Sequence, residues 1–208
     1  MTYSVMLMRA GRIRLVGILC ILIPILTLTF ISASIYVARN WFILTRHALS
    51  NLGATEVESY IIFNSGLIII GVLSMAASVL IILESWSTNR LRIIPTALLL
   101  ITSIFLIGIG LFPMDAAPEA HWTSAVLFFV LIGFTMLGFG LYYLYYREVL
   151  LGILGILGLV IDFVVWGIAP WESFGITGVA IPEILSVLVP MIWLIIFALK
   201  ILRTGKIP

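Results

Sequence analysis

The segment GLFPMDAAPEAHWTS, from Gly110 to Ser124, is a polar stretch between two long apolar runs. It places Asp115, Glu119 and His121 within seven positions, in a chain that is 63% hydrophobic and only 10% charged. Unpaired charge in hydrocarbon is strongly unfavourable, so such a cluster must lie where water or another polar group reaches it. We therefore predict that this segment is a surface loop that joins two membrane-spanning helices.

Apolar runs like the two that flank this loop recur along the chain, and each has about the 20 residues that a helix needs to cross the hydrocarbon core of a bilayer. A helix also satisfies its own backbone hydrogen bonds in lipid. The sequence therefore predicts an all-α polytopic membrane protein, a bundle of six transmembrane helices that forms one domain over residues 1–208. The predicted spans are about 13–36, 57–83, 92–112, 122–146, 149–168 and 180–201.

Charges are distributed unevenly between the two sides of this predicted bundle. Six spans put both termini on one side, which then holds nine of the 11 basic residues, whereas Arg39 and Arg46 fall on the other. Because cytoplasmic loops are enriched in Lys and Arg, we predict cytoplasmic termini in a multi-pass protein of the cell membrane. Most acids and both histidines, His47 and His121, then lie on the extracytoplasmic face, where we expect any chemistry.

The longest polar connection, residues 39–59, contains HALSNL followed by Gly53, a pattern typical of a short helix with a glycine stop. Such a helix would place His47, Ser50 and Asn51 on one face. Two interpretations stay open: a polar triplet that points into the bundle, or a capped helix at the membrane interface. Thr55 and Glu58 match a capping box, which predicts the start of the second span there.

Three polar side chains lie inside or at the start of predicted spans. Asn64, in the second span, needs a hydrogen-bond partner at its depth. Ser124 follows His121 by three positions, on the same helix face. Asp162 interrupts the apolar sequence VIDFVVW, and an intramembrane carboxylate is a candidate functional residue. The candidate partners of Asp162 are His47, His121, Arg39 and Arg46.

Close helix packing is predicted by three glycines of the fifth span, Gly152, Gly155 and Gly158, which recur every three residues. The lone Cys20 lies in the first span and cannot form an internal disulfide, so we expect it to be a buried small side chain. The chain contains no Gln and little Asn, a tendency of thermophile proteins that suggests a thermophilic archaeal source.

Three blocks of the sequence resemble the signature blocks of the DUF998 family of small prokaryotic membrane proteins. They are RHALSNLG (Arg46 to Gly53), FNSGLIIIG (Phe63 to Gly71) and GLFPMDAAPEAHWTSAVLFF (Gly110 to Phe129), and they cover roughly the first two thirds of the chain. More distantly, the family resembles the six-helix Frag1/DRAM/Sfk1 group. The resemblance implies no activity, because the family has no assigned function. It does imply that five positions define the family: His47, Ser50, Asn64, Asp115 and His121.

These residues together predict one extracytoplasmic site. We expect His47, Ser50, Asp115, His121 and Asp162 to be its catalytic residues. Imidazole and carboxylate groups also bind zinc, so His47, Asp115 and His121 are candidate ligands of a divalent metal such as zinc. Neither HExxH nor HxxxH spacing is present, which makes the metal signal weak. Arg46, Asn51, Asn64 and Ser124 are expected to support the site or its substrate.

Three function classes follow from this predicted site. The first is a membrane-embedded, hydrolase-like enzyme that acts on lipid or a lipid-linked substrate. The second is a non-enzymatic module that binds lipid or a protein partner in the membrane, including an accessory subunit of a larger complex. The third is a haem or redox subunit with His47 and His121 as axial ligands. Membrane lipids are expected partners, and nucleic acid is not, because no glycine-rich phosphate loop follows a strand.

Overall fold

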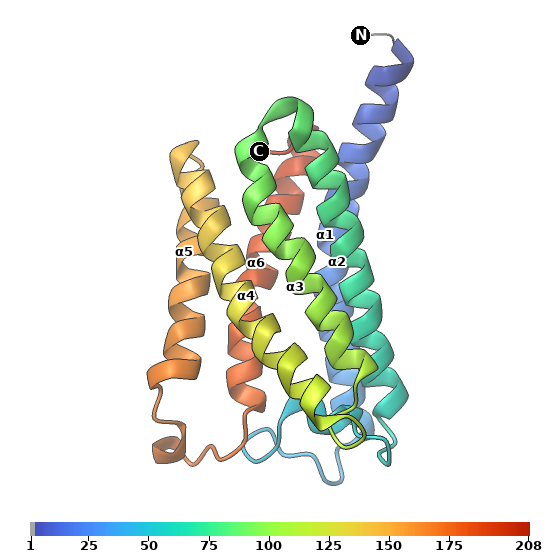
Figure 1. Ribbon diagram of the computed structural model, residues 1–208, viewed down its shortest axis with the longest axis vertical. Helices are drawn as coiled ribbons and strands as arrows, with labels where there is room; N and C mark the ends of the chain where they lie inside the picture. Colours follow the sequence, from blue (N-terminus) through green and yellow to red (C-terminus); the bar gives the residue numbers. More distant parts are fainter. Residues whose placement is uncertain (1–2) are drawn as a thin grey trace.

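The computed structural model describes residues 3–208 as a bundle of six long helices (Figure 1). They are α1 (Tyr3–Val37), α2 (Tyr60–Thr88), α3 (Ile93–Leu111), α4 (Pro118–Tyr145), α5 (Val149–Phe163) and α6 (Ala180–Thr204). A π-helical turn, η3 (Val164–Ile168), extends α5. With η3 counted as part of α5, all six helices are long and apolar enough to cross a membrane, which confirms the predicted all-α, six-helix fold.

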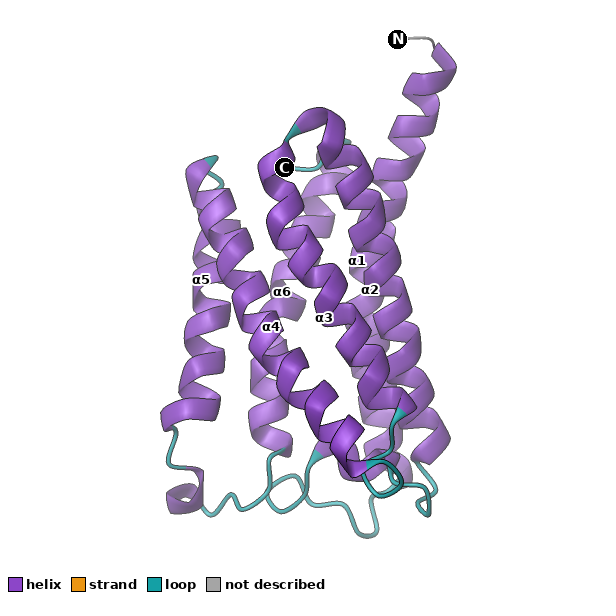
Figure 2. Cartoon of the chain, viewed as in Figure 1, coloured by secondary structure: helices purple, strands orange, loops and turns teal. Residues whose placement is uncertain are grey.

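Each helix packs against its neighbours in the sequence, and α6 also packs against α1, which closes the bundle. The start of α1 and the end of α6 lie at one end of the molecule, which we call the terminal end (Figure 1). The longer irregular connections gather at the opposite end, which we call the loop end (Figure 2). These connections are residues 38–59, 112–117 and 169–179.

The start of α2 differs from the sequence prediction. The helix begins at Tyr60, with Ser59 at its N-cap. Thr55 therefore lies outside the helix and donates its backbone N–H to Asp115 at 2.9 Å. The predicted Thr55–Glu58 capping box is wrong, because Thr55 pairs with a loop that is 60 residues away and the sequence gives no sign of this contact.

An aromatic core fills the half of the bundle nearer the terminal end. Phe139, Trp193 and Phe197 are buried. Trp193 stacks on Phe197 with ring centroids 4.9 Å apart, and the tilted ring of Phe139 lies 4.7 Å from Trp193. The Trp193 indole N–H donates to the main-chain oxygen of Leu151 at 3.0 Å, which joins α6 to α5. Cys20 is a free, buried thiol, as predicted. Lipid offers these helices no hydrophobic gain from association, so such close packing holds them together.

The glycines of α5 make the tightest contact between α4 and α5. A Cβ atom on Gly155 would lie 2.4 Å from the Cα of Gly140, closer than any side chain tolerates. Gly152 lies against Leu144, and Gly158 lies against Met136. The predicted packing role of these glycines is therefore confirmed. From this contact the two helices diverge toward the loop end (Figure 1), which leaves room for a cavity between them.

Candidate functional site

The α1–α2 connection is fastened to the start of α6 at the loop end. It contains a short 3-10 helix, η1 (Leu49–Gly53), where the sequence predicted a short helix. The backbone N–H of Leu49 donates to Glu183 Oε2 at 2.6 Å, and the N–H of Ala180 donates to the His47 carbonyl at 2.9 Å. Gly178 lies against the backbone of Arg46 and His47: a Cβ atom added to Gly178 would be 2.4 Å from backbone atoms of both residues. Glycine is needed at 178 for this close approach.

His47 holds the shape of its own connection. Its Nδ1 accepts the backbone N–H of Ile43 at 2.9 Å, and its ring stacks on Phe42 with centroids 5.6 Å apart. The ring also meets Trp41 edge to face at 5.5 Å. These contacts favour the interpretation of this segment as a capped interfacial turn.

His121 lies in the first turn of α4 and is only 6% exposed. Its Nδ1 is 2.8 Å from the carbonyl oxygen of Phe112. A carbonyl can only accept a hydrogen bond, so Nδ1 carries the hydrogen, and in the neutral ring Nε2 is then an acceptor. Within the described chain, Nε2 has no hydrogen-bond partner. The imidazole is thus held in one orientation, with one nitrogen available to a ligand.

His121 lines a cavity of about 490 Å³ between α4, α5 and α6, which we call the lateral cavity. Its polar lining is Ser50, His121, Asp162 and Glu183, and its main aromatic lining is Trp122, Phe129, Phe134, Phe163 and Trp166. Trp122, Phe134 and Phe163 are each more than half exposed on the outer surface of the helices. The lateral cavity therefore opens on the outer surface of the helices and has a mostly apolar lining with a few polar side chains.

Asp162 is buried on α5 and contributes a carboxylate to the lining of the lateral cavity. Its Oδ2 lies close to Gly133 of α4: a Cβ atom added to Gly133 would be only 3.0 Å from this oxygen. Its Oδ1 is buried and has no hydrogen-bond partner among residues 3–208. None of the expected partners, His47, His121, Arg39 or Arg46, bonds to it, so that expectation is wrong. An unsatisfied buried oxygen is costly, and functional sites are where proteins accept such costs.

Asp115 lies outside the lateral cavity and joins two connections of the loop end. It is exposed, and one of its oxygens accepts both the hydroxyl and the backbone N–H of Thr55. The hydroxyl above all holds the pKa of Asp115 below its ordinary value, because both bonds favour the charged carboxylate. Asp115 is thus part of the scaffold in this structure, and the site that was predicted around it divides into two parts.

The Asp115–Thr55 contact predicts a pH dependence of stability. Because the pKa of Asp115 is lower in the folded state, its contribution is complete above the unfolded-state pKa and is lost as the pH falls through the folded-state pKa. Changing Thr55 to Ala removes the hydroxyl bond but keeps the backbone N–H, so the pKa of Asp115 is expected to return partway toward its ordinary value and the acid sensitivity to decrease. A carboxyl NMR titration measures the shift, with Thr123→Ala, at an exposed site, as the control. An equal pKa in both variants would contradict the assignment.

The structure brings together only some of the predicted site residues. Ser50, His121 and Asp162 line the lateral cavity, whereas His47 and Asp115 do not. Among residues 3–208 no group of three His, Cys, Asp or Glu side chains could hold a metal ion, so the proposed ligands His47, Asp115 and His121 are not gathered. The catalytic roles of the cavity residues stay predictions.

The four supporting residues have scaffold contacts. Asn64 is buried and donates to the Gly53 carbonyl at 2.8 Å, and Asn51 accepts the N–H of Ala48 at 2.7 Å. The buried Ser124 lies against Gly108. Arg46 is exposed, and its backbone lies against Gly178. These contacts support η1 and the neighbouring helices and do not extend into the lateral cavity.

Glu183 follows Pro182 in the first turn of α6, where local rules assign an acid only a favourable interaction with the helix dipole. The structure puts it in the wall of the lateral cavity, bonded to Leu49 across 134 positions of sequence. The sequence shows an acidic residue near the end of a span, which is a weak sign of a site. The contact with Leu49 cannot be predicted from local spacing.

The model of one protein family matches residues 8–200 of the chain, and its description is "Protein of unknown function (DUF998)". The match extends through α5 and into α6, further than the three sequence blocks that first indicated the family. No curated protein and no solved structure matches the chain.

Proposed function

This chain belongs to the DUF998 family, which has no assigned function, and we propose that it binds a membrane lipid in the lateral cavity. The observation that carries the proposal is the cavity itself: about 490 Å³, with a mostly apolar lining that includes four polar side chains. Its volume falls within the range of about 300–1,000 Å³ that is typical of ligand sites.

The distribution of side chains favours an amphiphile over a water-soluble ligand. The exposed rings of Trp122, Phe134 and Phe163 would contact lipid tails in a membrane, so an acyl chain could enter sideways between α4 and α5. A polar headgroup would then reach His121 and Glu183. The His121 Nε2 accepts, the Ser50 hydroxyl donates or accepts, and the carboxyl groups favour a headgroup that carries hydroxyls or a positive charge.

The charge distribution supports an outward orientation of the lateral cavity. The basic residues near the terminal end of the bundle are Arg9, Arg12, Arg14, Arg90, Arg92, Arg147, Lys200, Arg203 and Lys206. Only Arg39 and Arg46 belong to the loop end. By the positive-inside rule the terminal end is cytoplasmic, and the cavity opens toward the outer leaflet of the cell membrane.

The test is to measure the lipid that copurifies with the protein in a mild detergent, by native mass spectrometry. We expect bound lipid in the unaltered protein and a loss of about tenfold in affinity, ~1.4 kcal/mol, in Ala125→Trp, because the indole fills the cavity that Ala125 lines. The loss appears as a lower occupancy. The matched control is Ala76→Trp, on the exposed surface of α2 and away from the cavity. Equal occupancy in the two variants, or an unaltered protein without bound lipid, would refute the proposal.

A hydrolytic activity on the bound lipid is the second candidate, and the orientation of His121 favours it. The Phe112 carbonyl holds Nδ1, and the free Nε2 is suited to take a proton from water or a substrate hydroxyl. Conversion of bound lipid to a product of lower mass, lost in His121→Gln while lipid binding persists, would distinguish an enzyme from a binding module. The haem alternative loses support because His47 does not line the cavity.

A further inference from the structure

A second cavity lies inside the bundle, between α1, α2, α3, α4 and α6, and we call it the central cavity. Its volume is about 140 Å³. Five side chains line both this cavity and the lateral cavity: Ser50, His121, Ala125, Phe129 and Glu183. The two cavities therefore adjoin at these side chains, and three of the five are polar.

The central cavity extends from the loop end toward the middle of the bundle. Its lining spans residues 63–74 of α2, 121–132 of α4 and 183–194 of α6, and each interval is about 16 Å of helix. At its deep end it shares Ser74 and Leu194 with a void of only about 20 Å³ among the rings of the aromatic core. The central cavity is thus narrow and ends against the aromatic core, a shape that suits a hydrocarbon chain.

Away from the loop end, the lining of the central cavity offers few hydrogen bonds. The hydroxyls of Thr27, Thr102 and Ser103 donate to carbonyl oxygens of their own helices at 2.7–2.8 Å. Among the described residues that line this cavity, only His121 and Glu183 are ionisable. Apolar cavities of about 150 Å³ stay dry and accept apolar molecules, because a buried water needs several polar partners. Hydrocarbon is therefore a better occupant of this cavity than water.

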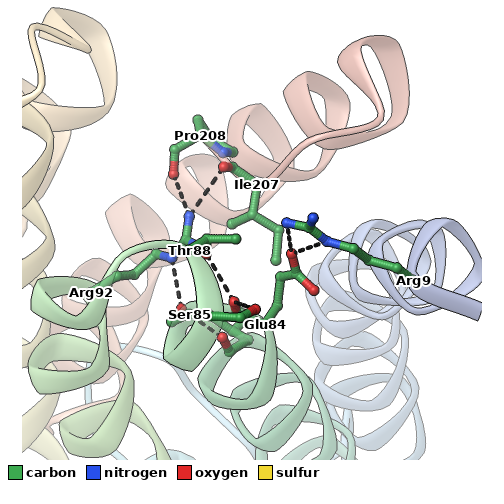
Figure 3. Close-up of polar contacts among 9 residues, drawn as sticks. Arg9, Glu84, Ser85, Thr88, Arg92, Ile207 and Pro208 are labelled. Atoms are coloured by element: carbon green, nitrogen blue, oxygen red, sulfur yellow. Dashed lines mark hydrogen bonds and ion pairs between the residues drawn. The ribbon is translucent and has the colours of Figure 1, made fainter. Parts of the chain in front are cut away.

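The polar groups buried at the terminal end are already bonded to one another (Figure 3). Glu84 pairs with Arg9, and Arg92 donates from its Nε to the Ser85 hydroxyl at 2.8 Å. None of these four side chains lines the central or the lateral cavity. A ligand in the central cavity therefore finds its main polar partners at the loop end, among the side chains that the two cavities share.

We propose that the two cavities bind one lipid that has two hydrocarbon chains, with one chain in the central cavity and the other in the lateral cavity. Its polar group then lies at Ser50, His121 and Glu183, which line both cavities. This inference rests on the lipid binding proposed above and names the class of lipid. In a membrane, hydrocarbon chains surround the helices, and a chain in the central cavity supplies the van der Waals contacts that its lining otherwise lacks.

The test uses a diacylglycerol that carries a photoreactive diazirine at the end of one chain, because its neutral headgroup has a hydroxyl that can donate to His121 Nε2. The full chain in a neutral detergent is irradiated with this probe, and the labelled residues are identified by mass spectrometry of peptides. Ile70 and Met191 line the central cavity but not the lateral cavity, and they are 4% and 8% exposed. Label on these two residues is the expected result, and label on Ile69, which is 42% exposed, measures the background from the surface.

Two variants of α2 make the same change at different places. Ser74→Leu puts a larger apolar side chain at the deep end of the central cavity, whereas Ser65→Leu changes a half-buried residue that lines neither cavity. We expect Ser74→Leu to lose most of the label at Ile70 and Met191, and Ser65→Leu to keep it. The labelling of the unaltered protein remains decisive even if Ser74→Leu does not fold.

Competition by unlabelled lipids tests the number of chains. We expect a diacylglycerol to displace the probe at a concentration about tenfold lower than a monoacylglycerol with the same chain, since about five further carbon atoms in a close-fitting site contribute this much. Label confined to the lateral cavity, equal competition by the two lipids, or equal loss of label in the two variants would overturn this inference and leave lipid binding in place. Absence of label from both cavities would overturn it too, and the copurified lipid then shows separately whether the lateral cavity binds a lipid of another kind.

Discussion

Gly155→Ala is expected to destabilise the bundle by about 1–3 kcal/mol, the usual cost of overpacking a close contact. The new Cβ would lie 2.4 and 2.5 Å from the Cα and nitrogen of Gly140, and 2.7 Å from the Met136 oxygen. All three atoms belong to the backbone, so no side chain can turn away to make room. The helices α4 and α5 would have to separate, and a lower midpoint of thermal unfolding in detergent would report it.

The matched control is Gly11→Ala in α1, where an added Cβ meets nothing within 4 Å. There the change is expected to be neutral or to raise stability by up to about 1 kcal/mol, because Ala has the higher helix propensity. Since the Gly140–Gly155 contact is where α4 and α5 meet before they diverge, the Gly155→Ala variant should also bind less lipid. Equal unfolding midpoints in the two variants would show that this contact does not restrain the helices.

The helices themselves could be predicted from the sequence. In lipid a spanning segment must be long, apolar and helical, so hydropathy alone gave six spans, and spacing alone gave the packing role of Gly152, Gly155 and Gly158. These predictions succeed because each depends on residues within one segment.

The composition of the site could be predicted only in part, because contacts between connections decide it. His47 and His121 are the two histidines of the chain, and both lie in or next to polar connections of the loop end. The His47 ring bonds to the backbone of Ile43 and stacks on Phe42. The His121 ring bonds to the carbonyl of Phe112 and lines the lateral cavity. Asp115 was expected beside His121 because they are six positions apart, yet it bonds to Thr55 on another connection.

Burial of charge was also invisible to sequence spacing. Arg92 and Glu183 both lie near span ends, where charged side chains normally reach water. Arg92 is covered by Ile207 and Pro208, and Glu183 is covered by Leu49, in each case a segment more than 100 positions away. Local rules assign such residues to the membrane surface, and only tertiary structure shows that they line cavities.

Asp162→Leu is expected to make the protein more stable and less able to bind lipid. Leucine has nearly the shape of aspartate, so it fills the same space beside Gly133 without the carboxyl oxygens. The unsatisfied Oδ1 disappears, and removing such a group returns about 1–3 kcal/mol. The lateral cavity loses one of its four polar side chains, so lipid occupancy should fall. Thermal unfolding and native mass spectrometry measure the two effects on one sample.

The opposite signs of these two effects make the experiment informative. If Asp162 served only to hold the fold, its replacement would lower the unfolding midpoint, and lipid occupancy would fall only as the folded fraction falls. A residue kept for ligand binding behaves otherwise, because a protein accepts its cost in stability for the sake of the ligand. Asp162→Asn keeps a polar group of the same size and should bind more lipid than Asp162→Leu. A destabilised Asp162→Leu protein that still carries lipid would remove Asp162 from the site.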